Sequence, residues 1–470
     1  MARCCVTEQR GFHYRDLILS PLSVQRVAAG IHFRHLPLGR FFPLVKYVRY
    51  QGEVAVGLRL WSPRCRDKAC LGDCVAQMRF EVLQRICVNF AVIHRFSRLA
   101  AVDRLFAQSQ GPKISRASVG ARGAHQFTGS RQHVEFVGSH ILSIDQFDRQ
   151  DIDRIFAVAD MMEPYASRAR VTRVLKGAIL GNMFFEPSTR TRVSFGCAFN
   201  LLGGEVRETT GVETSALAKG ESLYDTARVL SGYSDVIAMR HPSEGSVEEF
   251  ASASRVPVIN GGDGANEHPT QALLDLYTIS KEIAAKGRGV DGLRIGMVGD
   301  LKFGRTVHSL AKLLCLFDNI SLHLVSPAAL AMPEEIIERL RSAGHTVDVS
   351  EQLEASIAHV DIVYSTRIQE ERFGSREEAD IYRGKFRLNQ SVYTQFCEPN
   401  TVIMHPLPRD SRAEANELDP DLNENPNLAI FRQADNGVLV RMALFALTLD
   451  VVDQVDKHSH DVTWYTSGRH

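Results

Sequence analysis

The stretch FFEPSTRTRVSF, residues 184–195, places hydroxyl and guanidinium groups where a short apolar run gives way to a helical pattern. Ser188, Thr189, Arg190 and Thr191 lie at the expected start of the helix. The first N–H groups of a helix have no partner within it and carry partial positive charge, so they can bind a phosphate group. The hydroxyls add donors, and Arg190 adds a charged, forked one. The stretch is therefore a candidate phosphate site; the alternative is an ordinary capped helix start with solvated arginines.

Five further polar residues follow short apolar runs elsewhere in the chain: Arg240, Asp300, Arg367, Gln369 and His405. In open parallel sheets the carboxyl ends of the strands form the edge at which ligands bind. Three of these five residues are Arg or His. The pattern therefore predicts an anion-binding cleft at the edge of one or more parallel sheets.

The elements that must position these side chains begin with short apolar runs that are rich in β-branched residues and end at polar or turn residues. Such runs are typical of strands buried on both faces of a parallel sheet. They span residues 175–185, 234–241, 256–261, 293–300, 321–326, 360–367 and 400–409.

Helical patterns separate these runs. Over residues 268–287, Ala272, Leu276, Ile279 and Ile283 can share one face, and Gly287 is the expected stop. A second helical pattern covers residues 304–317. Alternating strands and helices predict an α/β fold, and about 330 residues exceed what one such sheet normally holds. We therefore expect two doubly wound parallel-sheet domains with the active site in the cleft between them.

Overall composition is ordinary for a globular protein: 470 residues, net charge zero and 44% hydrophobic residues. It indicates neither a nucleic-acid partner nor a membrane partner, and no apolar run reaches the roughly 18 residues that span a bilayer. Residues 1–135 differ from the rest because they are basic, poor in acidic residues and rich in Cys. We expect them to be a poorly ordered extension of unknown structure with no catalytic role.

The cysteines give no metal or disulfide pattern. Cys65, Cys70 and Cys74 match no zinc-binding spacing, and no His pair completes the set. The three later cysteines are far apart in the sequence and fit a reducing compartment: Cys197, Cys315 and Cys397. We therefore expect a protein of a reducing compartment, the cytoplasm.

Residues 137–455 resemble the aspartate/ornithine carbamoyltransferase family, and within it the chains that use aspartate. The matching segments follow the order and spacing of the family: FFEPSTRTRVSF, SALAKGES, MRHPSEG, GDGANEHPTQALLDLYTI, GDLKFGRTVHSLA, STRIQEERF and MHPLPR. The resemblance implies transfer of the carbamoyl group of carbamoyl phosphate to L-aspartate, a step of pyrimidine biosynthesis. It implies no metal, no other cofactor and no covalent enzyme intermediate.

The resemblance assigns roles to named residues. The phosphate would be held by Ser188, Thr189, Arg190, Thr191 and Arg240, and the carbonyl oxygen would face Thr191, Arg240 and His268. The carbamoyl NH₂ group would donate to Gln271 and to the main-chain carbonyls of Pro406 and Leu407, with Pro408 closing that loop.

On the aspartate side, the resemblance implies that Arg305 and Arg367 bind the two carboxylates, with Gln369 as a further donor and Glu186 orienting one of the arginines. Arginine suits bidentate carboxylate binding better than lysine does. Ser215 and Lys219 belong to a loop that, in the family, enters the active site of a neighbouring subunit. This implies a homotrimer; whether regulatory chains also bind stays open.

The expected domains follow from the same resemblance. The carbamoyl phosphate domain covers residues 136–269 together with a C-terminal helix at 432–455. The aspartate domain covers residues 270–431, and residues 456–470 form a tail.

Three other functions can be compared with this one on the residues of the chain. Ornithine carbamoyltransferases share the phosphate motif, but they carry Cys in the loop that here reads His405-Pro406-Leu407-Pro408, and a cationic substrate does not fit Arg367. A non-catalytic scaffold is expected to lose site residues, and every motif position is retained. A P-loop nucleotide binder is excluded because no GxxxxGK[ST] sequence follows a strand.

Overall fold

The computed structural model divides into two compact units, residues 1–123 and 124–470. In the first unit it describes only an antiparallel sheet of three strands, β1 (Tyr14–Leu17), β2 (Phe42–Tyr50) and β3 (Glu53–Trp61). In the second it describes residues 134–466 except 212–215, 371–372, 374–379, 411, 413–414 and 465. The expectation of poor order in residues 1–135 falls, apart from the three strands and residues 134–135, on residues that the structure does not describe, and so does the cluster Cys65–Cys74.

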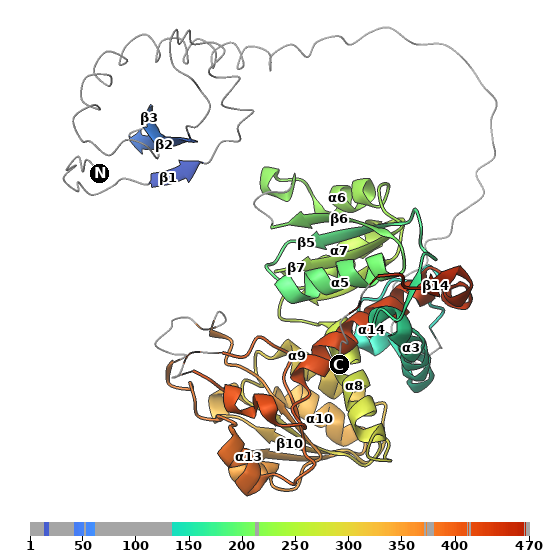
Figure 1. Ribbon diagram of the computed structural model, residues 1–470. Coiled ribbons are helices and arrows are strands. Elements are labelled where there is room, and N and C mark those ends of the chain that lie inside the picture. The colour runs from blue at the N-terminus through green and yellow to red at the C-terminus, as the bar shows by residue number, and fades with distance from the viewer. Residues whose placement is uncertain are drawn as a thin grey trace, which may run out of the picture. The chain divides into compact units, whose positions relative to one another are not determined.

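The first α/β region is built on a four-stranded sheet in which every neighbouring pair is parallel. Its strand order is β6 (Glu205–Thr210), β5 (Ile179–Phe184), β7 (Val236–His241) and β8 (Val258–Asp263). The helices that connect these strands are α5 (Thr189–Leu201), α6 (Leu223–Leu230) and α7 (Ser246–Ala253). Figure 1 shows them above and below the sheet in green.

The second α/β region holds a five-stranded parallel sheet. Its strand order is β11 (Thr346–Ser350), β10 (Ser321–Val325), β9 (Arg294–Val298), β12 (Ile362–Ser365) and β13 (Val402–Met404). Its helices include α9 (Arg305–Leu314), α10 (Glu334–Ser342), α11 (Leu353–Ile357) and α13 (Gln390–Phe396). The predicted fold class, two parallel-sheet regions flanked by helices, is confirmed.

Two buried helices join the sheet regions. Helix α8 (Pro269–Ala284) leads from the first sheet to the second, and α14 (Ile430–Thr448) returns along it. Helix α14 packs against α8, α5 and α3 (Arg149–Met161), as Figure 1 shows near the centre of the molecule. Residues 439–448 of α14 are all buried, which is typical of a helix segment enclosed on all sides, whereas the start of the helix is partly exposed. The two sheets are therefore held through a shared helical layer.

All seven apolar runs form strands, and the apolar face predicted for α8 is buried. Within the two parallel sheets, the strands that the sequence analysis missed are β6 and β11. Both lie at sheet edges, and their sequences, EVRETT and TVDVS, leave most side chains exposed. A strand with only one packed neighbour needs no continuous apolar run, so the sequence signal was weak. Residues 459–461, predicted to lie in the tail, form β14 and pair with β4 (Arg170–Thr172).

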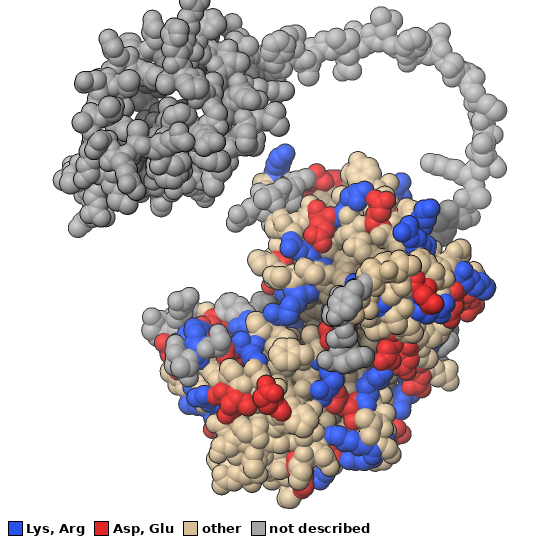
Figure 2. Space-filling model, in the orientation of Figure 1, with Lys and Arg blue, Asp and Glu red and all other residues tan. Residues whose placement is uncertain are grey.

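Among the described residues, no helix combines the length and apolar composition needed to cross a membrane, and no group of three or more His, Cys, Asp or Glu is arranged to hold a metal ion. Figure 2 shows basic and acidic side chains interspersed over the face that it presents. A notch opens between the two sheet regions in this view, and Lys and Arg side chains border it.

Gly299 gives a test of how tightly the end of β9 packs. It has φ of +116°, and a Cβ atom there would lie 2.2 Å from the carbonyl oxygen of Thr366. We expect Gly299→Ala to lower the free energy of unfolding by about 2 kcal/mol or more, through strain and overlap combined. Urea denaturation followed by circular dichroism measures this change.

Gly287→Ala is the matched control. Gly287 also has positive φ, +73°, but nothing lies within 4 Å of an added Cβ atom. Only the backbone strain of about 1 kcal/mol applies there. Equal losses in the two variants would show that the contact with Thr366 does not constrain this strand end.

Candidate active site

The start of α5 follows the C-terminal end of β5, as the sequence predicts. Ser188 occupies the N-cap position in an extended conformation, and its side chain makes no capping hydrogen bond. Thr189, Arg190 and Thr191 form the first turn of a 13-residue helix whose opposite side packs through Phe195 and other apolar residues. The first N–H groups and the hydroxyls thus share one helix end, which is suited to an anion.

Arg190 and Arg367 bring positive charge to the same place from different sheets. Burial lowers the pKa of the Arg190 guanidinium, and the charge of Arg367 lowers that pKa further. Arg190 starts α5 beside the first sheet, whereas Arg367 follows β12 of the second sheet. The carboxyl edges of the two sheets therefore converge on one positively charged site.

Glu186 is one of the acidic residues that join the two regions. Its Oε2 atom lies 2.8 Å from Nη2 of Arg240 and 3.5 Å from Nη2 of Arg305. Arg240 ends β7, Arg305 begins α9, and both guanidinium groups are largely buried. The expectation that Glu186 pairs with an arginine across the cleft is confirmed, and it pairs with two. Arg305 also donates to the carbonyl oxygen of Gly264, which ties α9 to the loop after β8.

His268 is buried between these arginines at the N-cap of α8. Its buried Nδ1 atom has no hydrogen-bond partner among the residues that the structure describes. Burial lowers the pKa of His268 well below its usual value, and Arg240, Arg305 and Arg441 add to this effect. The imidazole is therefore neutral at pH 7 and has one ring N–H to donate to a ligand.

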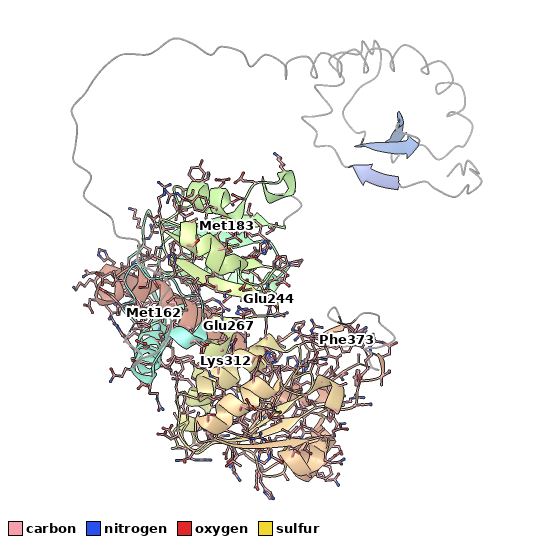
Figure 3. All side chains as sticks on the ribbon, turned by 180° about the vertical axis from the view of Figure 1, so that it is seen from behind. Met162, Met183, Glu244, Glu267, Lys312 and Phe373 are labelled. Atoms are coloured by element: carbon pink, nitrogen blue, oxygen red, sulfur yellow. The ribbon has the colours of Figure 1, made fainter. Side chains whose placement is uncertain are left out.

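The loop that carries His268 is anchored by its neighbour Glu267. The Glu267 carboxylate accepts from Nζ of Lys312 at 3.1 Å, from Oγ of Ser143 at 3.1 Å and from the backbone N–H of Ile144 at 2.9 Å. Figure 3 labels Glu267 and Lys312 where the two sheet regions meet. A buried carboxylate with three donors is well satisfied, so this junction holds His268 in position.

Gln271 is held by a carboxylate that the sequence analysis did not select. Its Nε2 atom donates to Oδ1 of Asp275 at 2.8 Å. The same oxygen accepts from Nε2 of Gln433 at 2.6 Å, and Oδ2 accepts from the hydroxyl of Tyr364 at 2.6 Å. Oε1 of Gln433 in turn accepts from the backbone N–H of His405 at 3.0 Å. One fully buried carboxylate thus links α8, α14, β12 and the loop after β13.

That loop, His405 to Pro408, has a conformation fixed by several contacts. The backbone N–H of Leu407 donates to Nδ1 of His405 at 2.8 Å, and Nε2 of His405 lies 2.8 Å from Oε1 of Glu417. Leu407 has φ of +58°, which is uncommon for a residue other than glycine and is typical of constrained functional loops. The carbonyl groups of Pro406 and Leu407 therefore keep fixed directions.

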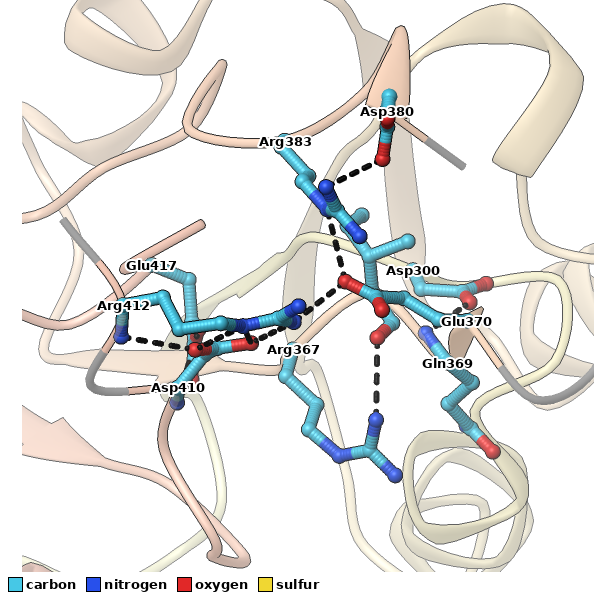
Figure 4. Close-up of polar contacts among 10 residues, drawn as sticks. Asp300, Arg367, Gln369, Glu370, Asp380, Arg383, Asp410, Arg412 and Glu417 are labelled. Carbon is cyan, nitrogen blue, oxygen red and sulfur yellow. Dashed lines mark hydrogen bonds and ion pairs between the residues drawn. The ribbon is translucent and has the colours of Figure 1, made fainter. Parts of the chain in front are cut away.

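Arg367 and Gln369 lie just beyond β12, as Figure 4 shows. The backbone N–H of Gln369 donates to Oδ2 of the buried Asp300 at 3.1 Å, and its side chain donates to the carbonyl oxygen of Phe303 at 2.7 Å. Burial raises the pKa of Asp300, whereas three backbone N–H groups and Arg367 oppose this increase. Asp300 thus shapes the loop that presents Arg367.

A second ion-pair group supports this loop and was also missed by the sequence analysis. The Glu370 carboxylate lies 2.8 Å from Nε of Arg383 and 2.5 Å from Nη2 of Arg412 (Figure 4). Arg412 also donates to Asp410, at 3.0 Å from its Nε atom. The hydrogen bond from Arg383 lowers the pKa of Glu370. These residues join the loop after β12 to the loop after β13.

Arg441 is a buried cation that contacts residues of α5. It donates to Oγ of Ser194 at 2.9 Å and to the carbonyl oxygen of Gly437 at 2.9 Å, and it lies over the ring of Phe195 at 4.8 Å. Burial lowers the pKa of Arg441 to about 10, although Asp275 opposes this change. Asp275 and Arg441 each interrupt an apolar stretch of α8 or α14, which was a sequence signal for both, whereas Gln433 lies in a polar stretch and gave no such signal.

The structure describes one of the two residues in the loop that was predicted to enter a neighbouring subunit. Lys219 ends a short 3₁₀ helix, η2 (Ala216–Lys219), and is exposed. Ser215 lies outside the described residues.

Two models of one protein family match this chain. Residues 139–281 match the family described as "Aspartate/ornithine carbamoyltransferase, carbamoyl-P binding domain", and residues 291–448 match its "Asp/Orn binding domain". The chain therefore belongs to the aspartate/ornithine carbamoyltransferase family. Within that family it is similar to proteins named aspartate carbamoyltransferase catalytic subunit.

The match with this chain covers nearly the full length of two such relatives. The protein of Saccharophagus degradans is 79% identical over 334 residues, which are 71% of this chain and 99% of the relative. That of Cellvibrio japonicus is 77% identical over 336 residues, 72% and 99% of the two chains.

Solved structures agree with these sequence relatives. The catalytic subunit of M. jannaschii aspartate transcarbamoylase has a TM-score of 0.61 and 42% identity, covering 67% of this chain and 99% of that chain. Aspartate transcarbamoylase from Trypanosoma cruzi in complex with carbamoyl phosphate has a TM-score of 0.62 and 38% identity, covering 67% and 97%.

The Asp275 carboxyl gives a prediction about pH. Burial raises its pKa to about 6 from an ordinary value of 3.8, so the fold favours the protonated form. The stability that this preference provides is complete below about pH 4 and is lost as the pH rises through about 6, by up to about 3 kcal/mol. The nearby titratable groups, Tyr364 and Arg441, keep their charge over this range.

Asp275→Asn removes this titration. We expect the melting temperature of the wild type to fall relative to that of Asp275→Asn between pH 4.5 and pH 7. Differential scanning fluorimetry at a series of pH values measures the difference. A difference that stays constant over this range would contradict a raised pKa.

Proposed function

We propose that this chain catalyses transfer of the carbamoyl group from carbamoyl phosphate to the amino group of L-aspartate, with N-carbamoyl-L-aspartate and phosphate as products. The observation that carries the proposal is the convergence of the α5 N-terminus, Arg240, Arg305 and the neutral His268 where two parallel sheets meet. Relatives that are up to 79% identical carry the name of this activity.

Carbamoyl phosphate would bind through its phosphate to Ser188, Thr189, Arg190 and Thr191, with Arg240 as a further cation. This set joins helix N–H groups, hydroxyls and guanidinium groups, and such charge-assisted contacts are the strong ones for a phosphate dianion. Residues 136–269 with 432–455 would form the domain for this substrate, and residues 270–431 the domain for aspartate.

In the reaction the neutral amine attacks the carbonyl carbon, the new C–N bond forms, and the bond from carbon to the phosphate oxygen breaks. Negative charge develops on the carbonyl oxygen, where Thr191, Arg240 and the N–H of neutral His268 would stabilise it. Gln271 and the carbonyl groups of Pro406 and Leu407 would accept from the carbamoyl NH₂ group. The leaving phosphate can take up the proton that the amine releases, so no further reactant is needed.

Aspartate would bind through its two carboxylates to Arg305 and Arg367, with Gln369 as a neutral donor. The charge of Arg367 already acts on Arg190, so an anionic substrate relieves repulsion that a cationic one would increase. This argues against ornithine as the acceptor. A scaffold without activity is disfavoured because the described site residues are assembled with buried, hydrogen-bonded support.

We also propose a homotrimer in which Ser215 and Lys219 complete the site of a neighbouring subunit, a role in pyrimidine biosynthesis and a cytoplasmic location. The exposure of Lys219 in a single chain supports a role outside its own fold. The homotrimer is tested by light scattering of the purified full-length chain.

The substrate assignment is tested with the purified full-length chain, carbamoyl phosphate and either aspartate or ornithine. We expect colorimetric detection of N-carbamoyl-L-aspartate with aspartate and no citrulline with ornithine, because Arg367 repels the second amino group. Turnover with ornithine would contradict the substrate, and binding of carbamoyl phosphate without turnover would favour the scaffold.

Arg367→Ala tests the aspartate side alone. Loss of one charged hydrogen-bonded contact, about 3 kcal/mol, predicts a rise in the KM for aspartate on the order of 100-fold. The dissociation constant of carbamoyl phosphate, measured by calorimetry, should change far less. Arg387→Ala is the control, since Arg387 is an exposed arginine of the same region that pairs with Asp419. Equal losses for both substrates would refute the role of Arg367.

A further inference from the structure

We propose that Asp275 is a positioning residue that fixes the direction of the Gln271 amide and, through Gln433, of the loop His405–Pro408. Its function is to make the site accept hydrogen bonds from the NH₂ end of the carbamoyl group. The inference rests on the proposed carbamoyl transfer and deepens it.

The first support is the pattern of hydrogen bonds. Oδ1 of Asp275 accepts from Nε2 of Gln271 at 2.8 Å and from Nε2 of Gln433 at 2.6 Å. In a primary amide the oxygen and nitrogen lie on opposite sides of the carbon atom. Each glutamine that turns its NH₂ group toward Asp275 therefore turns its carbonyl oxygen away from it. The outward oxygen of Gln433 accepts from the backbone N–H of His405 at 3.0 Å.

The second support is chemical. An ionised carboxylate can only accept hydrogen bonds, whereas an amide at the same place can accept or donate. The carboxylate therefore excludes the flipped form of Gln271, in which oxygen would face oxygen. In that flipped form the NH₂ group of Gln271 would meet the NH₂ group of the substrate, donor against donor. Asp275 thus selects the one amide orientation that the carbamoyl group can use.

The third support is the cost of this arrangement. Asp275 is fully buried in the middle of α8, among apolar residues, and its burial opposes ionisation. A buried charge is retained at a loss of stability, which is typical of residues that serve a site. Tyr364 donates to the second oxygen at 2.6 Å and so connects the same carboxylate to β12, which leads to Arg367.

The test compares two ligands of the full-length chain by isothermal titration calorimetry: carbamoyl phosphate, which has the NH₂ group, and inorganic phosphate, which lacks it. In Asp275→Asn the amide at 275 no longer excludes the flipped form of Gln271. We expect the dissociation constant of carbamoyl phosphate to rise about tenfold, the effect of one hydrogen bond, and that of phosphate to stay within about twofold.

Asp151→Asn is the matched control. Asp151 is also a fully buried carboxylate, and it accepts from the backbone N–H of Asp148 at the start of α3 and from that of Val134. Its loss should lower stability without changing the ratio of the two dissociation constants. Gln433→Met is a second variant for the case in which Asp275→Asn does not fold. It breaks the connection to His405 but keeps Asp275 and Gln271, and we expect a smaller rise in the same ratio.

The outcomes separate the two proposals. A parallel rise for both ligands, or no rise for either, in a folded Asp275→Asn or Gln433→Met variant would overturn the positioning role while the wild type still binds and turns over substrate. Failure of the wild-type chain to bind carbamoyl phosphate would overturn the proposed function and this inference with it.

Discussion

The structure depends on one electrostatic constraint: several guanidinium groups must be held close together in a largely buried place. Arg240 and Arg305 share Glu186, and Arg190 lies within the field of Arg367. Like charges that lie close together repel strongly when little water screens them. Added negative charge is favourable beside such a group of cations, so the site favours anionic ligands. The phosphate and the two carboxylates of the proposed substrates would supply that charge.

This constraint also determines the state of the uncharged groups nearby. His268 stays neutral because a further positive charge beside Arg240, Arg305 and Arg441 would be costly, and burial adds to that cost. A neutral imidazole and a guanidinium can then point at the same oxygen without opposing each other. The buried Nδ1 of His268, which has no hydrogen-bond partner among the described residues, is consistent with a partner that arrives with the substrate.

Opposite the cations, a group of acceptors is ordered by Asp275. Its three donors come from α8, α14 and β12, and the α14 donor reaches on to the loop after β13. The same two helices join the sheets, so the packing that holds the regions together also orients the amides. The cation side and the acceptor side are thus built from different interactions, ion pairs in one case and directional hydrogen bonds in the other. This division suits a substrate that has a phosphate at one end and an NH₂ group at the other.

The sequence by itself determined the seven apolar strands, the helices at 269–284 and 305–314, and the helix start at 188–191 with its hydroxyl and guanidinium groups, because each is encoded by neighbouring residues. Residue types at strand ends also identified Arg240, Arg367 and His405. Only the tertiary structure decided that Glu186 pairs with both Arg240 and Arg305. The same holds for the hydrogen bond that Asp275 accepts from Gln433, 158 positions away. Which distant polar or charged side chains will pair with one another cannot be read from a periodic pattern in the sequence. It is settled by the packing of α8 and α14, which decides which polar groups become buried together and must satisfy one another.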